Sequence, residues 1–115
     1  MHLITHISGG GIDLKFADVI FSFGLSAELT DLWNPPEIMQ QVVTWRGMSD
    51  QEAYKVFNGG QGALAVIDAA DVKKFIRLAE QFNIEAKACG TITKESSPRV
   101  TINSKFNGEK VIFTP

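Results

Sequence analysis

The chain has 115 residues, the length of a single domain, and 44% of them are hydrophobic, which is enough to supply a core. Its formal net charge of −2, with no cluster of basic residues, argues against nucleic acid as a partner. No apolar stretch is long enough to span a bilayer, and no segment has the pattern of a secretory signal. The single cysteine, Cys89, cannot form an internal disulfide, so we expect a cytoplasmic protein. One cysteine and two histidines are too few for a structural metal site.

A run of glycines near the N-terminus, Gly9, Gly10 and Gly11, precedes an apolar helix predicted over residues 12–23. Consecutive glycines suit places where the backbone takes positive φ or approaches another group closely. Amide N–H groups at the start of a helix also favour anions, most often phosphate. A flexible loop is the alternative interpretation, because the run matches neither the dinucleotide fingerprint nor the P-loop.

Helix and strand signals alternate after this run and predict an α+β domain in which helices pack on a mixed β-sheet. We expect strands over residues 26–33, 63–67, 86–93, 99–106 and 110–113, and further helices over residues 37–46, 50–56 and 69–82. The strand at 63–67 is short and apolar, so we place it in the centre of the sheet.

Caps and turns mark the ends of several elements. Asn34 is expected to cap the second helix, with Pro35 as its first residue. Ser49 and Glu52 form a capping box for the helix at 50–56. The dipeptide Asn107-Gly108 predicts a hairpin between the last two strands, because both residues tolerate positive φ.

Helical spacing predicts which side chains face the core. In the second helix these are Ile38, Val42 and Trp45. In the last helix they are Val72, Phe75, Ile76, Ala79 and Phe82, while the charged residues between them face water.

A second glycine cluster occupies residues 57–62. One interpretation is a turn packed against neighbouring backbone, and the other is the wall of a ligand cleft in which Asn58 or Gln61 forms hydrogen bonds. His6 is a candidate general acid or base, although a histidine beside a glycine loop also serves in packing or hydrogen bonding. The carboxylates form no cluster suited to Mg²⁺. The residues therefore predict a domain that contacts a ligand and is not self-sufficient as a catalyst.

Three segments in this order resemble one family: His-Ile-Ser-Gly-Gly-Gly at 6–11, Trp-Asn-Pro-Pro at 33–36 and Tyr-Lys-Val-Phe-Asn-Gly-Gly-Gln-Gly at 54–62. Together they resemble the C-terminal domain of aminoimidazole ribonucleotide (AIR) synthetase, also called phosphoribosylformylglycinamidine cyclo-ligase. The resemblance covers residues 4–93. It implies a mixed sheet with helices, partly ferredoxin-like.

The resemblance also implies a division of labour between two domains. In this ATP-using superfamily an N-terminal domain supplies most contacts to ATP and Mg²⁺, and the C-terminal domain closes the cleft over the substrate. Residues 1–115 would then be an AIR synthetase-like C-terminal domain, with no cofactor expected for this chain alone. The residues implied to contact the substrate or its phosphate are Ser8, Gly9, Gly10, Gly11, Asn58, Gly60 and Gly62, with His6 as the catalytic candidate.

The chain departs from the family pattern at a few positions. Gly59 and Gln61 stand where the family usually has methionine and isoleucine, which puts a polar amide where packing is expected. Asp13 adds a negative charge close to the glycine run. Residues 96–115 show no motif that matches the family.

Two hypotheses about function follow. In the first, the chain is part of an enzyme in which ATP activates the formyl amide oxygen of formylglycinamidine ribonucleotide and an amine then closes the imidazole ring. In the second, it is a free-standing, non-catalytic binding or regulatory module that pairs with a separate subunit or with itself. Exposed Phe16, Phe21 and Phe23 would favour such association. We favour a piece cut from a longer enzyme over a natural free-standing half.

Overall fold

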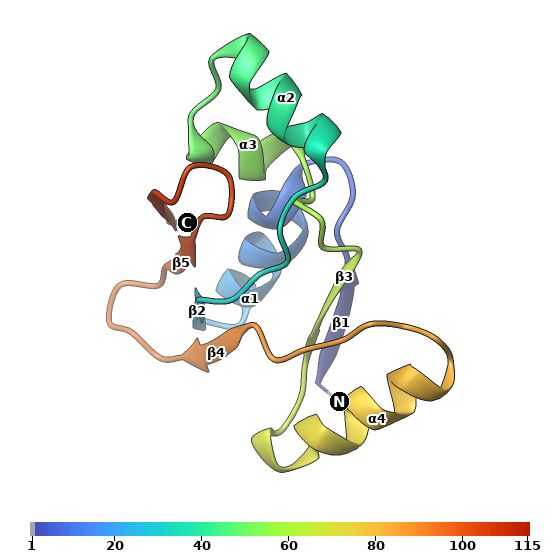
Figure 1. Ribbon diagram of the computed structural model, residues 1–115. Helices are drawn as coiled ribbons and strands as arrows, with labels where there is room; N and C mark the ends of the chain where they lie inside the picture. Colours follow the sequence, from blue (N-terminus) through green and yellow to red (C-terminus); the bar gives the residue numbers. More distant parts are fainter. Residues whose placement is uncertain (1) are drawn as a thin grey trace.

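The computed structural model describes residues 2–115, which form strands and helices in alternation (Figure 1). In chain order the elements are β1 (Leu3–His6), η1 (Asp13–Ala17), α1 (Asp18–Ser22), β2 (Ser26–Leu29), α2 (Glu37–Arg46), α3 (Asp50–Val56), β3 (Ala63–Val66), η2 (Ala69–Asp71), α4 (Val72–Gln81), β4 (Gly90–Thr93), β5 (Val100–Asn103) and β6 (Lys110–Phe113). The α+β fold class predicted from the sequence is confirmed. None of the helices within this part of the chain is long and apolar enough to cross a membrane.

The strands form two sheets. β1 pairs antiparallel with β3, and a separate four-stranded sheet has the order β4-β2-β5-β6. In the larger sheet β2 and β5 run parallel, while the β2–β4 and β5–β6 pairs are antiparallel. The prediction that residues 63–67 form a central strand is wrong. Within residues 2–115 β3 pairs with β1 alone, and its Ala63 and Ala65 are exposed while Leu64 is buried.

The core forms around the first helix, which lies between the two sheets (Figure 1). Residues 11–22 are continuously helical, with a wider π turn over η1. Thr5 in β1 donates its hydroxyl to the carbonyl of Lys15 at 2.7 Å, inside that turn. The helix presents Ile12, Phe16 and Ile20 to the core. The predicted helix at 12–23 is therefore confirmed to within a residue, but the expectation that Phe16 is exposed is wrong.

The first helix ends as the glycine after it predicts. Gly24 has a φ of +70°, and its amide donates to the carbonyl of Phe21 at 2.9 Å. Of the phenylalanines expected to lie exposed, Phe21 is half-buried against the core and only Phe23 is largely exposed.

The second helix begins later than the cap signals predict. Its bounds, Glu37–Arg46, match the expected range, but Pro36 occupies the cap position with an extended ψ of 151°. Asn34 and Pro35 each precede a proline, which disfavours helical backbone, so neither enters the helix. The capping box is confirmed in α3, where the amide of Glu52 donates to Ser49 Oγ at 3.1 Å.

The predicted core face of α2 is wrong. Ile38 and Trp45 are 63% and 74% exposed, and Val43 is the buried residue of this helix. In α4 the predicted apolar face is the more buried one, since Val72, Phe75, Ile76 and Ala79 are half-buried and the charged residues between them are exposed. No residue of α4 is fully buried, and Phe82 after it is 70% exposed. Both helices lie at the edge of the molecule in Figure 1, so their apolar faces are covered only in part. Spacing identifies an apolar face but not whether another element covers it.

The hairpin at the C-terminus is confirmed, with shorter strands than predicted. Asn103 in β5 is paired with Lys110 in β6, so residues 104–109 form the connecting loop. The amide of Ser104 donates to the carbonyl of Glu109 at 2.9 Å and closes this loop. The loop packs against α3.

Candidate functional site

The two glycine segments lie side by side at one end of the β1–β3 ribbon. His6 in β1 is paired with Ala63 in β3, and the amide of Ile7 donates to the carbonyl of Gly62 at 3.0 Å. The loop at 8–11 leaves β1 at this point, and the segment at 57–62 enters β3 there. Residues far apart in the sequence are thus brought together, as the resemblance implies.

The first glycine loop is open to solvent at its tip. Ser8 and Gly9 are exposed, and a Cβ added at Gly9 would meet no atom within 4 Å. The amide of Gly11 donates to the carbonyl of Ser8 at 3.0 Å, whereas the amides of Gly9 and Gly10 have no hydrogen-bond partner among residues 2–115. The tip therefore presents two main-chain donors just before the first helix.

The base of the same loop is tightly packed. A Cβ added at Gly11 would lie 2.0 Å from the carbonyl oxygen of Tyr54 and 2.8 Å from that of Phe57. Gly11 also has a φ of +60°, so both the close approach and the backbone conformation require glycine. The loop thus rests on the last turn of α3.

The second glycine segment is a compact turn. The amide of Gly60 donates to Asn58 Oδ1 at 2.9 Å. A Cβ at Gly60 would lie 2.7 Å from the carbonyl oxygen of Asn34, and one at Gly59 would lie 2.7 Å from the Tyr54 ring. This geometry agrees with the interpretation of a turn packed against neighbouring backbone. Gly62 is exposed beside β1, and a Cβ there would meet nothing within 4 Å.

Gln61 explains one departure from the family pattern. Its side chain is buried, and its Oε1 accepts from the amide of Trp33 at 2.5 Å. Its Nε2 donates to the carbonyl of Gly59 at 2.8 Å. The amide group therefore has protein partners and joins the 33–36 segment to the second glycine segment. Of the two groups considered for ligand contact, Gln61 is the one enclosed by the protein.

Charges near the glycine loop come from η1 and α3. Burial raises the pKa of Asp13, and the nearby positive charge of Lys55 lowers it in part, while Asp18 raises it. The negative charge anticipated at Asp13 is thus partly offset by a lysine on the neighbouring helix. His6 is exposed at the end of β1, one residue before the buried Ile7.

A buried carboxylate, at the end of α3 opposite the glycine loop, ties the helix to the 104–109 loop. Asp50 is fully buried, and its oxygens accept from Asn107 Nδ2 at 2.7 Å, from the Asn107 amide at 3.1 Å and from the Glu109 amide at 3.2 Å. Desolvation raises the pKa of Asp50, but hydrogen bonds, including one from Ser104, outweigh it and lower the pKa below its usual value. The 104–109 loop is thereby tied to the first turn of α3.

Tyr54 adds a second tie between the same loop and α3. Its hydroxyl accepts from the amide of Lys105 at 3.0 Å, and its ring packs edge-on against Phe106 with centroids 5.0 Å apart. Sequence reasoning missed both Asp50 and Tyr54 as supports of the site. Ser49 marked the start of α3, but no local signal pairs that helix with a loop more than 50 residues later.

Metal-binding groups are scarce in this domain. Residues 2–115 contain no group of three or more histidine, cysteine, aspartate or glutamate side chains placed to hold a metal ion. These residues alone therefore do not form a three-ligand metal site.

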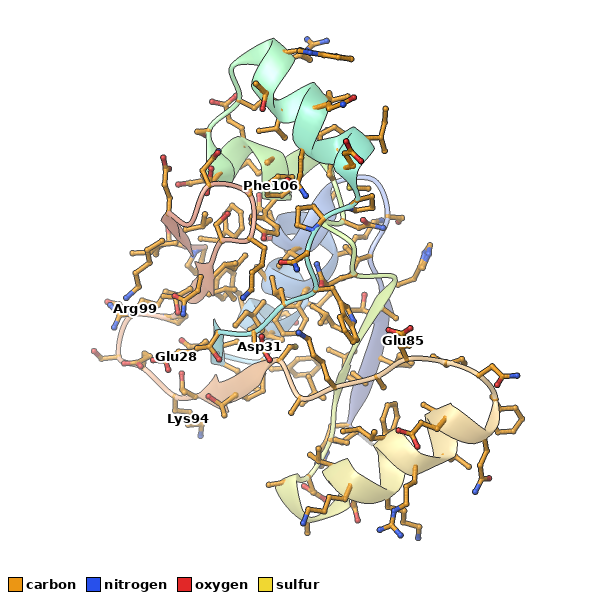
Figure 2. All side chains as sticks on the ribbon, in the orientation of Figure 1. Glu28, Asp31, Glu85, Lys94, Arg99 and Phe106 are labelled. Atoms are coloured by element: carbon orange, nitrogen blue, oxygen red, sulfur yellow. The ribbon has the colours of Figure 1, made fainter. Side chains whose placement is uncertain are left out.

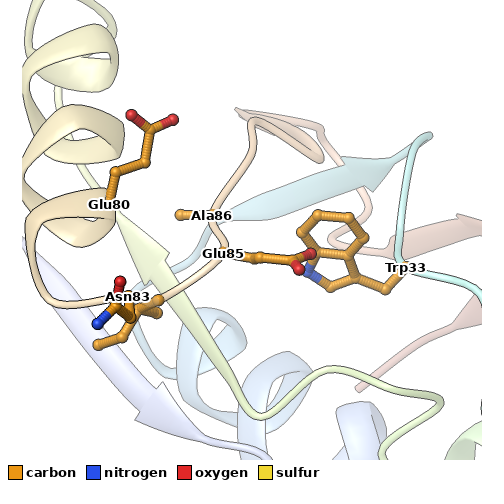
Figure 3. A pocket seen from close by; sticks show the side chains of 6 residues that line it. Trp33, Glu80, Asn83, Glu85 and Ala86 are labelled. Atoms are coloured by element: carbon orange, nitrogen blue, oxygen red, sulfur yellow. The ribbon is translucent and has the colours of Figure 1, made fainter.

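Two cavities lie away from the glycine segments. One of about 390 Å³ is lined by Trp33, Glu80, Asn83, Ile84, Glu85 and Ala86 (Figure 3). The other, of about 460 Å³, lies along α4 beside Lys74, Arg77, Leu78 and Gln81. Neither is lined by a glycine of the two segments.

The fold and the paired glycine segments define an α+β domain that offers main-chain donors at an exposed loop. The family described as AIR synthase related protein, C-terminal domain, matches residues 1–103. The chain belongs to this family. The match ends at the last residue of β5, so the 104–109 loop and β6 lie beyond it.

Several curated proteins are similar to this chain, and all of those described here are named phosphoribosylformylglycinamidine cyclo-ligase. The protein from Oceanobacillus iheyensis is 30% identical over 100 residues, which is 86% of this chain and 29% of that protein. The one from Bordetella petrii is 41% identical over 68 residues, covering 58% of this chain and 19% of the relative. The one from Methanococcus vannielii is 26% identical over 116 aligned positions, covering 96% of this chain and 32% of that protein. The chain thus spans less than a third of the length of each.

Proposed function

We propose that this chain is the C-terminal, substrate-contacting part of an AIR synthase-like enzyme. The complete enzyme would close the imidazole ring of formylglycinamidine ribonucleotide in an ATP-dependent step of purine biosynthesis. The family match over residues 1–103 and the names of the relatives support this proposal. The close packing of the 33–36 segment on the second glycine segment, where a Cβ at Gly60 would lie 2.7 Å from the carbonyl oxygen of Asn34, supports it further, because both segments belong to the resemblance.

The exposed tip of the first glycine loop is the observation that carries the proposal. The amides of Gly9 and Gly10 would hold the ribose phosphate, with the Ser8 hydroxyl as a further donor. Each N–H that binds a charged oxygen contributes about 1.5–3 kcal/mol. The continuous helix behind the loop places the positive end of its dipole at the same point. Gly11 supports this site through its packing, because its own amide is bonded to Ser8.

The remaining roles are divided between the rest of the longer enzyme and other residues of this chain. An N-terminal domain or subunit would bind ATP and Mg²⁺, as the resemblance implies. His6, exposed at the end of β1, would orient the substrate or exchange a proton with it. Asn58, Gly60 and Gly62 would form the neighbouring wall, with Asn58 Nδ2 as the side-chain donor available for a ligand.

The test is a titration with a ribonucleotide 5′-phosphate, followed by NMR through the glycine amides. We expect the amides of Gly9 and Gly10 to shift in the wild-type chain at millimolar ligand. Gly9→Val should weaken the shifts, because its branched side chain would crowd a ligand at the two donors. It should not unfold the domain, because a Cβ there meets no atom within 4 Å. Gly24→Ala, at a turn on another part of the chain, serves as the control. Equal binding by the wild type and Gly9→Val would refute the assignment of the loop.

The exposed apolar side chains of α2 and α4 favour a second candidate function. Ile38, Trp45 and Phe82 are each more than half exposed, which suits a non-catalytic module that pairs with a separate subunit or with itself. Gel filtration and an ATPase assay discriminate between the candidates. A stable oligomer whose assembly is lost in Trp45→Ser supports the module, whereas ATP turnover by the purified chain excludes it.

A further inference from the structure

A cluster of opposite charges lies where three separate segments meet. Lys87, in the connection between α4 and β4, places its Nζ 3.3 Å from Asp31 Oδ1. Lys105, in the 104–109 loop, places its Nζ 3.8 Å from the same oxygen. Asp31 follows β2 and lies beside β4 (Figure 2), and its amide donates to the carbonyl of Cys89. Two ammonium groups therefore converge on a single carboxylate oxygen.

The local charge balance favours an anion. The chain as a whole has a net charge of −2, yet this cluster of two lysines and one aspartate carries one positive charge in excess. The nearest other carboxylate on the connection, Glu85, lines the cavity next to Trp33 and forms no ion pair with either lysine (Figure 3). Excess positive charge at a partly desolvated point attracts anions more strongly than the same charge in open water.

The two lysines are held in place more firmly than the aspartate between them. The side chains of Lys87 and Lys105 are 28% and 32% exposed, whereas that of Asp31 is 59% exposed. Lys87 Nζ also lies 4.4 Å from the centre of the Trp33 ring and donates to the carbonyl of Leu32 at 3.4 Å. The carboxylate can therefore turn into solvent while the ammonium groups keep their positions.

We propose that Lys87 and Lys105 form a second anion site, for a phosphate-sized dianion that displaces the carboxylate of Asp31. Both lysines share one oxygen of Asp31, whereas a phosphate offers a separate oxygen to each, so the exchange relieves that crowding. The ligand is free phosphate or the phosphate of a monoester. This site is distinct from the Gly9–Gly10 donors and goes beyond the proposed function. It is linked to the second glycine segment through the bond from the Trp33 amide to Gln61.

Calorimetric titration with inorganic phosphate tests the site with variants that should change the affinity for phosphate in opposite directions. Lys105→Ala and Lys87→Met should each weaken binding by about 5–10-fold, the effect of one charge-assisted contact that is partly exposed. Asp31→Asn should tighten binding by a similar factor, because it removes the competing charge. Lys94→Ala, an exposed lysine at the far end of β4 (Figure 2), is the matched control and should bind as the wild type does.

The fluorescence of Trp33 gives a second readout of the same site. In a Trp45→Phe background Trp33 is the remaining tryptophan, and its emission should change when phosphate replaces the carboxylate beside Lys87, whose Nζ lies over the ring. Ribose 5-phosphate in place of phosphate distinguishes the sources of the anion. Binding of both identifies a site for monoesters, and binding of phosphate alone identifies a site for the free ion.

Three results would overturn the proposal. The first is an affinity for phosphate that Asp31→Asn leaves unchanged or weakens. The second is an equal loss in Lys94→Ala, which would mean that only the overall charge matters. The third is binding that Gly9→Val abolishes and the lysine variants leave intact, because the phosphate would then bind at the glycine loop alone. That third result would contradict this proposal while supporting the proposed function, so the two fail separately.

Discussion

Replacing the buried Asp50 by asparagine should destabilise the domain more than any exposed aspartate replacement. Asparagine has nearly the same shape but offers one acceptor oxygen instead of two. In the wild type Oδ2 accepts from the amides of Asn107 and Glu109, and Oδ1 accepts from Asn107 Nδ2. Whichever way the new amide turns, its NH₂ group faces at least one of these donors.

The magnitude follows from the bonds that are lost. A hydrogen bond to a charged group contributes about 1.5–3 kcal/mol, and an unsatisfied buried donor costs a further amount of similar size. One or two of these hydrogen bonds are lost on substitution, and any that remain are made to an uncharged oxygen. We therefore expect Asp50→Asn to lower the free energy of unfolding by about 2–4 kcal/mol at pH 7.

The pH dependence gives the same prediction an internal check. Hydrogen bonds lower the pKa of Asp50 in the folded state despite desolvation, so the ionised carboxylate stabilises the fold. This contribution is fully present above the pKa of the unfolded chain, about 4. It is lost as the pH falls through the lower folded-state pKa. The difference between wild type and Asp50→Asn should therefore shrink in acid.

Urea unfolding followed by circular dichroism, at neutral pH and in acid, measures both effects. Asp71→Asn is the control, because the side chain of Asp71 precedes α4 without forming a capping hydrogen bond. It should change the free energy of unfolding by less than about 0.5 kcal/mol. A loss at Asp50 no larger than at Asp71, or a loss that is the same at both pH values, would refute the reasoning.

Further predictions concern the packing around the two glycine segments. In urea unfolding Gly11→Ala should destabilise the fold by about 4 kcal/mol or more, because its Cβ would lie 2.0 Å from a backbone oxygen. Gly24→Ala has open space around it and should destabilise the fold by only about 1 kcal/mol. Gln61→Met should lower the free energy of unfolding by about 1–3 kcal/mol by leaving a main-chain amide unpaired, and the exposed Gln41→Met should be nearly neutral in the same assay. Cys89 should react more slowly with iodoacetamide at pH 8 in the folded chain than in urea, because burial raises the pKa of its thiol more than nearby Lys87 lowers it. Equal rates in the two states would contradict that expectation.

Local signals predicted the elements whose ends are set by backbone chemistry. The Ser49 cap, Gly24 after the first helix and the Asn107-Gly108 turn all occur where the sequence places them. These features depend on residues within a few positions of one another, so they can be read from the sequence. Sheet membership and burial depend on distant elements. That dependence explains why residues 63–67 were wrongly predicted to be a central strand and Trp45 to face the core.

The candidate site divides along the same line. The sequence singled out both glycine segments, and the resemblance implies that residues of both contact the substrate or its phosphate. It did not separate the exposed donors at Gly9 and Gly10 from the packed Gly11, because that difference depends on where α3 ends. Gln61 looked like a ligand group until its partners, Trp33 and Gly59, were seen to enclose it.

The position of the glycine loop depends on residues beyond the family match. Gly11 rests on the carbonyls of Tyr54 and Phe57, at the end of α3. The loop at 104–109 holds that helix through Asp50 at its start and through the hydroxyl and ring of Tyr54. α3 has only 7 residues, and a helix of this length is not stable on its own. Its position is therefore set by the elements that pack against it. Substitutions that break the contacts of the 104–109 loop with α3 should therefore shift the Tyr54 and Phe57 carbonyls on which Gly11 packs, although no residue of that loop touches the Gly9 and Gly10 amides.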